Sequence, residues 1–365
     1  MSKRCPKIIH CIDSLSMGGA EVLLKNTLEL LPEFNHLIIC LDSGKKNKVV
    51  PIPGIRIIYL EHRGWSSLIT TVMKLKKIFK QEEPLLIHSH LFYSTLCARL
   101  ALPRATPLVS TLHSLYSKDA FDINRKSILA EKMTIRKKHT IIAVSEQVLQ
   151  DYLNYVDFKG NKYILHNFLP YLSFNNEVYK RYNKAGRFVA VGNLKAAKNY
   201  SYLLKIFGHL KKSGLALDIY GEGLKRGIME QEINDQGLNI SLCGTTEDVP
   251  RTLDNYDFFI QASSHEGFGI SVIEAMANGI PVFLSDIPVF REITNGLAIF
   301  FPLDDSQKAA EIIIESINNI KALEIQTNEA KKFVSANYSA EKYREKLLHI
   351  YNEITGGKIL EQCVA

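Results

Sequence analysis

Two carboxylates eight positions apart mark the stretch Ser263–Pro281, which reads SSHEGFGISVIEAMANGIP. Glu266 precedes a glycine-containing turn, and Glu274 follows within an apolar segment of helical character. A helix that begins near Gly269 would place Glu274 on its second turn and Glu266 in the loop just before it. The backbone N–H groups and the positive dipole end of such a helix form an anion site between the carboxylates. The arrangement suits a ligand with phosphate in its middle and hydroxyl-rich groups at both ends, which is the shape of a nucleotide sugar.

A lysine in a distant loop is the second candidate for this chemistry. Lys198 follows the apolar segment Arg187–Val191, which reads as a strand, so it lies where the carboxyl end of a parallel sheet binds phosphate. A solvated surface lysine is the alternative interpretation. The segment around Glu274 is apolar on nearly every side, which predicts burial, and a buried acid requires a partner.

Strand-like apolar segments alternate with amphipathic helical segments over residues 1–170 and again over residues 187–339. This alternation predicts an α/β fold of two Rossmann-like domains, each a doubly wound parallel sheet covered on both faces. Residues 171–186 show no clean period and predict a linker. Residues 340–365 read as a terminal helix and tail, and we expect this helix to pack back on the first domain. Because ligands of open α/β sheets bind at the carboxyl ends of strands, we expect the two domains to face each other across a cleft.

Composition excludes several classes of protein. Apolar residues make up 46% and charged residues 23% of the 365 positions, as in a globular protein, and no apolar run approaches the roughly 18 residues of a membrane span. Near the start, His10 and Asp13 interrupt the apolar stretch, which predicts a strand and not a signal peptide. The six cysteines are scattered without a Cys-x-x-Cys pair, which is typical of a reducing cytosol. We therefore expect a cytoplasmic protein.

Positive charge is concentrated in the first half. Residues 1–170 contain 24 Lys and Arg against 14 Asp and Glu, a net charge of +10, whereas the whole chain carries +7, so the remainder carries −3. Much of the excess lies on expected helices over Ser66–Lys80 and Ile123–Lys138. These are either solvated faces or contacts with anionic headgroups at the inner face of the membrane, near a lipid-linked acceptor. Aromatic residues are not interleaved with these charges, which argues against nucleic acid.

The stretch Ser263–Pro281 resembles the E-x7-E signature of the retaining glycosyltransferases of family 4, which have the GT-B architecture. The resemblance continues in order along most of the chain. It is carried by the segments Met17–Glu21, Ser110–His113, Phe188–Asn199, Ile219–Gly223 and Leu242–Val249. It implies that the first domain binds the acceptor and the second binds the donor.

The resemblance also implies roles for single residues of the signature. Glu266 would contact hydroxyls of the donor sugar, and Glu274 would hold the ribose hydroxyls. The backbone amides of Gly267, Phe268 and Gly269 would approach the sugar and the diphosphate, and small residues permit that approach.

Further roles follow from the other matching segments. Gly18 and Gly19 would lie against the diphosphate and the acceptor, although an ordinary turn between strand and helix is the alternative. His113 would lie near the donor sugar and the attacking acceptor, although a lone histidine is as often structural. Glu247 would read the nucleobase, and Val249 would pack on its face.

One position departs from the family pattern. Lys198 is expected to neutralise the leaving diphosphate together with an arginine, but Asn193 occupies the arginine position. The loss of a bidentate contact between arginine and phosphate costs about 1.5–3 kcal/mol, and Lys195 can substitute only as a point charge.

The sequence thus predicts a retaining glycosyltransferase that uses a UDP- or GDP-linked sugar, a saccharide or lipid-linked acceptor, and no cofactor or metal. His88 and His90 have no cysteine or carboxylate at ligand spacing, which argues against a metal site. The Gly221-Glu222-Gly223 turn is no dinucleotide fingerprint, because Arg226 holds the third glycine position. A nucleotide-sugar epimerase and a non-catalytic partner subunit of the same fold remain the alternatives.

Overall fold

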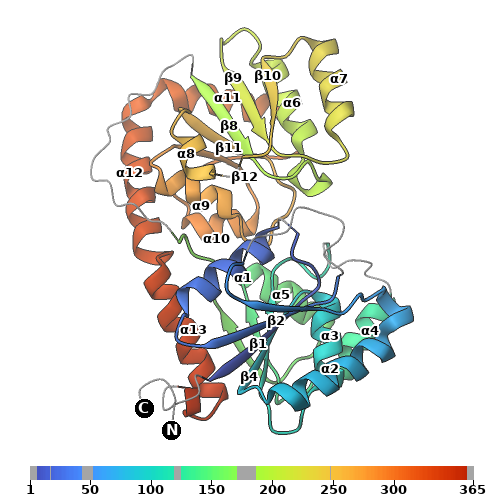
Figure 1. Ribbon diagram of the computed structural model, residues 1–365. Coiled ribbons are helices and arrows are strands. Elements are labelled where there is room, and N and C mark those ends of the chain that lie inside the picture. The colour runs from blue at the N-terminus through green and yellow to red at the C-terminus, as the bar shows by residue number, and fades with distance from the viewer. Residues whose placement is uncertain are drawn as a thin grey trace. The chain divides into compact units, whose positions relative to one another are not determined.

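The computed structural model describes residues 6–16, 18–42, 52–118, 125–170, 186–246 and 248–359. The chain divides into two compact units. The first comprises Met1–Pro170 together with Ala340–Ala365, and the second comprises Tyr171–Ser339. Each unit is an α/β structure built on one parallel sheet, as the alternating pattern predicts (Figure 1).

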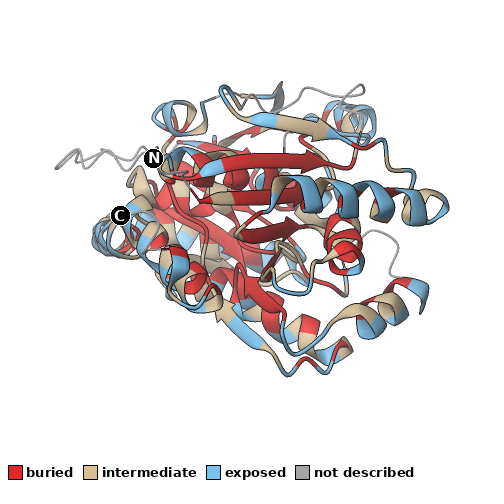
Figure 2. Ribbon diagram, turned by 60° about the horizontal axis from the view of Figure 1, so that its bottom comes forward, coloured by how far each residue is buried: buried red, intermediate tan, exposed pale blue. Residues whose placement is uncertain are grey.

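The first unit is built on a seven-stranded sheet in the order β3-β2-β1-β4-β5-β6-β7, with every neighbouring pair parallel. Its strands are β1 (Lys7–Ile12), β2 (Asn35–Cys40), β3 (Arg56–Tyr59), β4 (Leu86–His90), β5 (Leu108–Leu112), β6 (Thr140–Ala143) and β7 (Asn161–Ile164). The strand order reverses between β1 and β4, so the carboxyl ends of these two strands form the switch point at which ligands of such sheets bind. The central strands are almost wholly buried (Figure 2), because helices cover both faces of a parallel sheet.

Six helices and one short 3-10 helix complete the described part of the first unit. They are α1 (Gly19–Leu30), η1 (Gly64–Ser67), α2 (Leu68–Glu82), α3 (Phe92–Ala101), α4 (Arg125–Thr134), α5 (Glu146–Tyr155) and α13 (Ala340–Ile354). The terminal helix α13 packs on this unit, as predicted: Tyr343, Leu347 and Tyr351 join the apolar core under β1 and β4. Arg344 of α13 also forms an ion pair with Glu33, at 2.6 Å.

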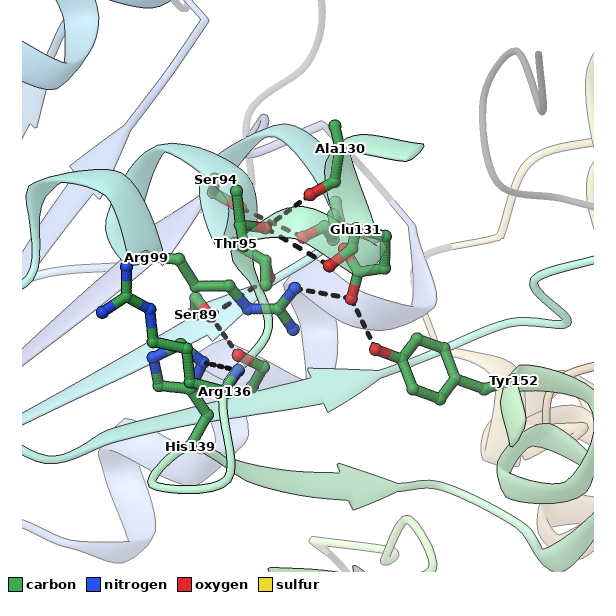
Figure 3. Close-up of polar contacts among 12 residues, drawn as sticks. Ser89, Ser94, Thr95, Arg99, Ala130, Glu131, Arg136, His139 and Tyr152 are labelled. Atoms are coloured by element: carbon green, nitrogen blue, oxygen red, sulfur yellow. Dashed lines mark hydrogen bonds and ion pairs between the residues drawn. The ribbon is translucent and has the colours of Figure 1, made fainter. Parts of the chain in front are cut away.

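A buried ion pair holds α4 against α3. Arg99 Nη1 lies 2.6 Å from Glu131 Oε1, and both side chains are almost fully buried. Tyr152 of α5 donates its hydroxyl to the same carboxylate oxygen, also at 2.6 Å (Figure 3). The expected helix Ile123–Lys138 ends earlier than predicted, at Thr134, because the chain after α4 folds into a turn closed by a hydrogen bond from the Arg136 N–H to Nδ1 of His139.

The second unit is built on a six-stranded parallel sheet in the order β10-β9-β8-β11-β12-β13. Its strands are β8 (Arg187–Val191), β9 (Ala216–Tyr220), β10 (Ile240–Gly244), β11 (Phe258–Gln261), β12 (Val282–Ser285) and β13 (Ile299–Phe301). Its helices are η2 (Ala196–Lys198), α6 (Tyr200–His209), α7 (Arg226–Gln236), α8 (Val249–Leu253), α9 (Ile270–Ala277), α10 (Pro288–Thr294), α11 (Ser306–Asn318) and α12 (Ile320–Asn337). The order again reverses once, between β8 and β11.

Helix α10 is absent from the sequence-based prediction. It spans only seven residues and begins with Pro288 in its first turn, a position that proline favours, but it is too short to show a clear helical period. None of the helices in the described part of the chain combines the length and the apolar character that a bilayer span requires.

Candidate functional site

The site in the second unit forms where two loops leave the carboxyl ends of β8 and β11. The loop after β8 contains η2, and the loop after β11 runs from Ala262 into α9. The loops are joined by their backbones, because Ser264 N–H donates to the carbonyl of Ala197 at 2.8 Å. Both lie at the switch point of the sheet, so side chains from distant parts of the chain meet there.

Lys198 and Glu266 are brought together at this point. Lys198 Nζ lies 2.7 Å from Glu266 Oε1, and the two side chains are only 18% and 14% exposed. The same carboxylate oxygen accepts hydrogen bonds from Gln261 Nε2 and Ser263 Oγ, each at 2.7 Å. The carboxylate is therefore held in one orientation by neighbouring side chains, and a cationic ammonium group lies beside it.

Two glycines give Lys198 the space that it occupies. Gly192 has a φ of +152°, and a Cβ at this position would lie 2.8 Å from Lys198 Cε. A Cβ on Gly221 would lie 2.0 Å from the carbonyl oxygen of Gly192. The turn around Gly221 therefore supports the loop after β8 by close backbone approach, which only glycine permits.

Asn193 and Lys195 flank a buried anchor in the same loop. Both side chains are exposed, whereas Leu194 between them is buried. The Leu194 N–H donates to the carbonyl of Glu222 at 2.9 Å. The loop is thus fixed through its backbone and presents these two side chains outward.

The segment Gly267–Gly269 leads into α9, which begins at Ile270, as the sequence predicts for a helix starting near Gly269. Gly269 caps this helix with a φ of +105°, a conformation that favours glycine. The Phe268 side chain is buried and packs edge-on against Tyr338, with ring centroids 5.6 Å apart. Gly267 and Gly269 are buried as well, so the whole segment is packed within the second unit at the start of α9.

Glu274 lies on the second turn of α9. Burial, reinforced by repulsion from Asp248, raises the pKa of its carboxyl group to about 8. At neutral pH the group is therefore mainly protonated and offers one donor and one acceptor. The neighbouring helix α8 is tied to α9 through the Asn278 side-chain amide, which donates to the Pro250 carbonyl at 3.1 Å.

The loop before α8 was predicted to bind the nucleobase. Glu247 lies outside the described residues. Val249 is the half-buried first residue of α8, and Asp248 caps that helix by accepting from the Arg251 N–H at 3.0 Å. Sequence reasoning missed Asp248, although an aspartate directly before Val-Pro is a recognisable cap signal.

In the first unit, Gly18 and Gly19 begin α1. Gly18 is its N-cap and Gly19 its exposed first residue. A Cβ on Gly18 would lie 2.5 Å from Glu21 Oε2. Glu21 itself is buried and accepts from Ser14 Oγ at 2.9 Å, so this glutamate, which sequence reasoning left out of the site, shapes the turn.

His113 follows β5, and its Nε2 lies 3.1 Å from Nδ1 of His90. Burial lowers the pKa of His113 to about 4, so the ring is neutral at pH 7.

Asp13, at the end of β1, accepts hydrogen bonds from the backbone N–H groups of Ser94 and Tyr93 at 2.6 and 3.2 Å. Burial raises the pKa of Asp13 to about 6. Sequence reasoning missed Asp13, because its partners lie about 80 residues further along the chain.

These features define a class of protein. Each unit has a parallel sheet with the strand order of a Rossmann fold, and the second unit gathers charged side chains and a glycine-rich helix start at its switch point. Two such units in one chain are the GT-B architecture. Solved structures agree: HepE from Anabaena, in complex with UDP-glucose, matches 95% of this chain and 99% of its own with a TM-score of 0.80 at 17% identity.

Family comparisons extend this assignment. The model of glycosyltransferase family 4 matches residues 17–170, and that of glycosyl transferases group 1 matches residues 173–340. The chain therefore belongs to the glycosyltransferases that these two models describe.

Curated relatives span nearly the same length. The putative glycosyltransferase EpsF of Bacillus subtilis is 23% identical and covers 96% of this chain and 98% of its own. The capsular polysaccharide biosynthesis glycosyltransferase CapH of Staphylococcus aureus is also 23% identical, covering 79% of this chain and 83% of its own.

Proposed function

We propose that this chain is a retaining glycosyltransferase that moves a hexosyl group from a nucleotide-diphosphate sugar to a saccharide or lipid-linked saccharide in polysaccharide synthesis. The observation that carries the proposal is the contact of Lys198 with Glu266 at the switch point of the second unit. A cation beside a fixed carboxylate suits a substrate in which an anionic diphosphate adjoins a sugar rich in hydroxyl groups.

In this proposal each group acts on one part of the donor. Lys198 turns from Glu266 toward the diphosphate and stabilises the charge that develops as the bond between the anomeric carbon and the phosphate oxygen breaks. Glu266 accepts hydrogen bonds from sugar hydroxyls, and the protonated Glu274 exchanges hydrogen bonds with the ribose hydroxyls. The acceptor oxygen bonds to the anomeric carbon on the face that the phosphate leaves, and its proton passes to the leaving phosphate oxygen. No enzyme nucleophile and no metal are required.

The names of relatives support the choice of donor. HepE has been solved with UDP and with UDP-glucose. A GDP-mannose-dependent mannosyltransferase of Xanthomonas campestris is 30% identical over 118 residues, about a third of this chain. We propose a UDP- or GDP-linked hexose, bound by the second unit, with Val249 and Glu247 at the base.

We assign acceptor binding to the first unit, with Gly18, Gly19 and His113 near the reacting groups. The neutral His113 ring is suited to donate or accept a hydrogen bond without adding charge.

A membrane-peripheral location is part of the proposal. Helix α2 exposes Ile69 and Met73 beside exposed lysines, and α4 exposes Leu129 and Met133 in the same way. Apolar side chains among basic ones suit the surface of an anionic bilayer. Vesicle sedimentation tests this: we expect salt-sensitive binding to anionic vesicles, and equal binding to neutral vesicles would refute it.

A panel of nucleotide sugars tests the function. We expect one UDP- or GDP-linked hexose to raise the melting temperature and, with a saccharide acceptor, to yield a product that keeps the anomeric configuration of the donor. Conversion of the donor without acceptor would instead identify an epimerase. Failure to bind any nucleotide would favour a non-catalytic subunit, an alternative that Asn193 in the arginine position motivates.

A further inference from the structure

Three buried histidines lie side by side on one face of the first sheet. His10 of β1 stands directly opposite His88 of β4 in the parallel register, and His90 follows two residues later on the same face. All three side chains are at most 4% exposed. Each histidine offers one ring nitrogen, and these three nitrogens all lie within 4.8 Å of one another.

The hydrogen-bond network leaves one ring nitrogen of His10 without a proton and without a hydrogen-bond partner among the described residues. The carbonyl of Leu31 can only accept, so His36 Nε2, 2.8 Å away, carries a proton. In a neutral His36 ring Nδ1 is then an acceptor, and His10 Nε2 donates to it at 3.2 Å. His10 Nδ1 therefore carries a lone pair and no proton. This nitrogen is fully buried and has no hydrogen-bond partner among the described residues.

His90 presents a second buried ring nitrogen, which carries a lone pair in the tautomer whose Nδ1–H donates to His113 Nε2. Its Nδ1 is engaged with His113, whereas its Nε2 is buried and likewise has no hydrogen-bond partner within the described part of the chain. Leaving a buried polar atom without a partner costs about 1–3 kcal/mol, and such atoms are rare in native structures. Two such nitrogens within one cluster of three imidazoles are what a site for a lone-pair-accepting ion would present.

We propose that His10, His88 and His90 form a binding site for one divalent transition-metal ion of the zinc type. Imidazole is a good ligand for zinc, cobalt, nickel and copper, whereas magnesium and calcium require oxygen ligands. Three histidines leave a fourth coordination position for water. Zinc–nitrogen bonds of about 2.0–2.1 Å require the three rings to close inward by small side-chain rotations.

Each proposed ligand already has an outer partner, which is the usual arrangement around a metal. His36 holds His10, and His113 holds His90. His88 is bonded to the hydroxyl groups of Tyr351, at 2.6 Å, and of Thr111, at 2.7 Å. In the proposed site the Thr111 hydroxyl is displaced from His88 by the metal, and the Tyr351 hydroxyl orients the ring.

An ion here would join β1 to β4 at the centre of the sheet and, through Tyr351, hold α13. Its role is structural, and the proposal does not depend on the transfer reaction.

The test begins with chelator-treated full-length protein titrated with Zn²⁺ and with Co²⁺. We expect one ion per chain, a rise of roughly 5–10 °C in the melting temperature of the first unit at a hundredfold excess over Kd, and a tetrahedral Co²⁺ spectrum without a thiolate charge-transfer band. Absence of stoichiometric binding would overturn the proposal and would point to a buried water in the cluster. A thiolate band would overturn it in favour of cysteine ligands.

Variants locate the site. His10→Gln and His90→Gln should abolish the stoichiometric ion, whereas His349→Gln, an exposed histidine of α13, should bind like the wild type. Should the core variants fold poorly, Tyr351→Phe removes only an outer partner and should weaken binding by about 10–100-fold. Wild-type affinity in all three substitutions at the cluster would refute the assignment.

Discussion

Replacement of Lys198 separates a structural from a catalytic role of the charged pair. The Lys198→Ala variant removes the ammonium group that lies 2.7 Å from Glu266 but leaves the hydrogen bonds from Gln261 and Ser263 to the same carboxylate oxygen. The remaining carboxylate is thus still partly satisfied. Because a hydrogen bond to a charged group contributes about 1.5–3 kcal/mol, we expect the free energy of unfolding to fall by about 1–2 kcal/mol.

The expected effect on catalysis is larger. A donor aimed at developing charge contributes about 2.7–4 kcal/mol to the transition state, so kcat should fall by about 10²–10³-fold in Lys198→Ala. Lys198→Arg keeps the charge and should recover part of the rate. Lys205→Ala, an exposed lysine on α6 of the same unit, serves as the control and should match the wild type.

Two measurements together distinguish a catalytic from a structural role of Lys198. Initial rates with the cognate donor and acceptor give kcat, and urea unfolding gives the stability of each variant. The proposed stabilisation of the leaving group is wrong if the kcat of Lys198→Ala stays within about threefold of the wild-type value. It is also wrong if the fall in rate is fully explained by a smaller fraction of folded protein. A double-mutant cycle with Glu266→Gln should give a coupling energy of about 0.5–3 kcal/mol in stability.

Three further predictions concern groups held in unusual environments. Glu274 keeps its proton up to about pH 8 in the folded state but loses it near pH 4.5 when unfolded. The free energy of unfolding therefore falls as the pH rises between these values. In urea unfolding, the free energy of Glu274→Gln should equal that of the wild type at pH 4 and exceed it by about 1–3 kcal/mol at pH 8. Gly192→Ala forces a side chain into a φ of +152° and against Lys198, and should cost about 1–3 kcal/mol and weaken donor binding in calorimetry. Glu131→Ala leaves Arg99 buried without its ion pair, and should lower the free energy of unfolding by about 3–5 kcal/mol; a loss below 1 kcal/mol would contradict this account.

Features that depend on strand ends were predictable from the sequence. An apolar segment followed by a glycine or a charged residue identifies the end of a parallel strand, and all such ends lie at one edge of a sheet. Lys198 and Glu266 were therefore expected at the same edge, and the structure places them in contact. The helix start at Gly269 was predictable for a similar reason, because glycines before an apolar run of helical period indicate it.

Features that depend on which strands are neighbours were not predictable. His10 lies beside His88 only because β1 and β4 are adjacent in the sheet, although 77 residues separate the two histidines in the sequence. The ion pair of Arg99 with Glu131 also depends on tertiary packing, here of α4 on α3. Local patterns show which residues are apolar or charged, but the partners across the sheet follow from topology.

The return of α13 to the first unit has a consequence for synthesis of the chain on the ribosome. Residues Ile8 and Leu23 share a core with Tyr343 and Tyr351, which are made more than 300 residues later. The apolar face under β1 and β4 therefore stays uncovered while the whole second unit is synthesised and begins to fold. A nascent chain in this state exposes the kind of surface that chaperones bind. The second unit, whose described elements are contiguous in sequence, has no such delay.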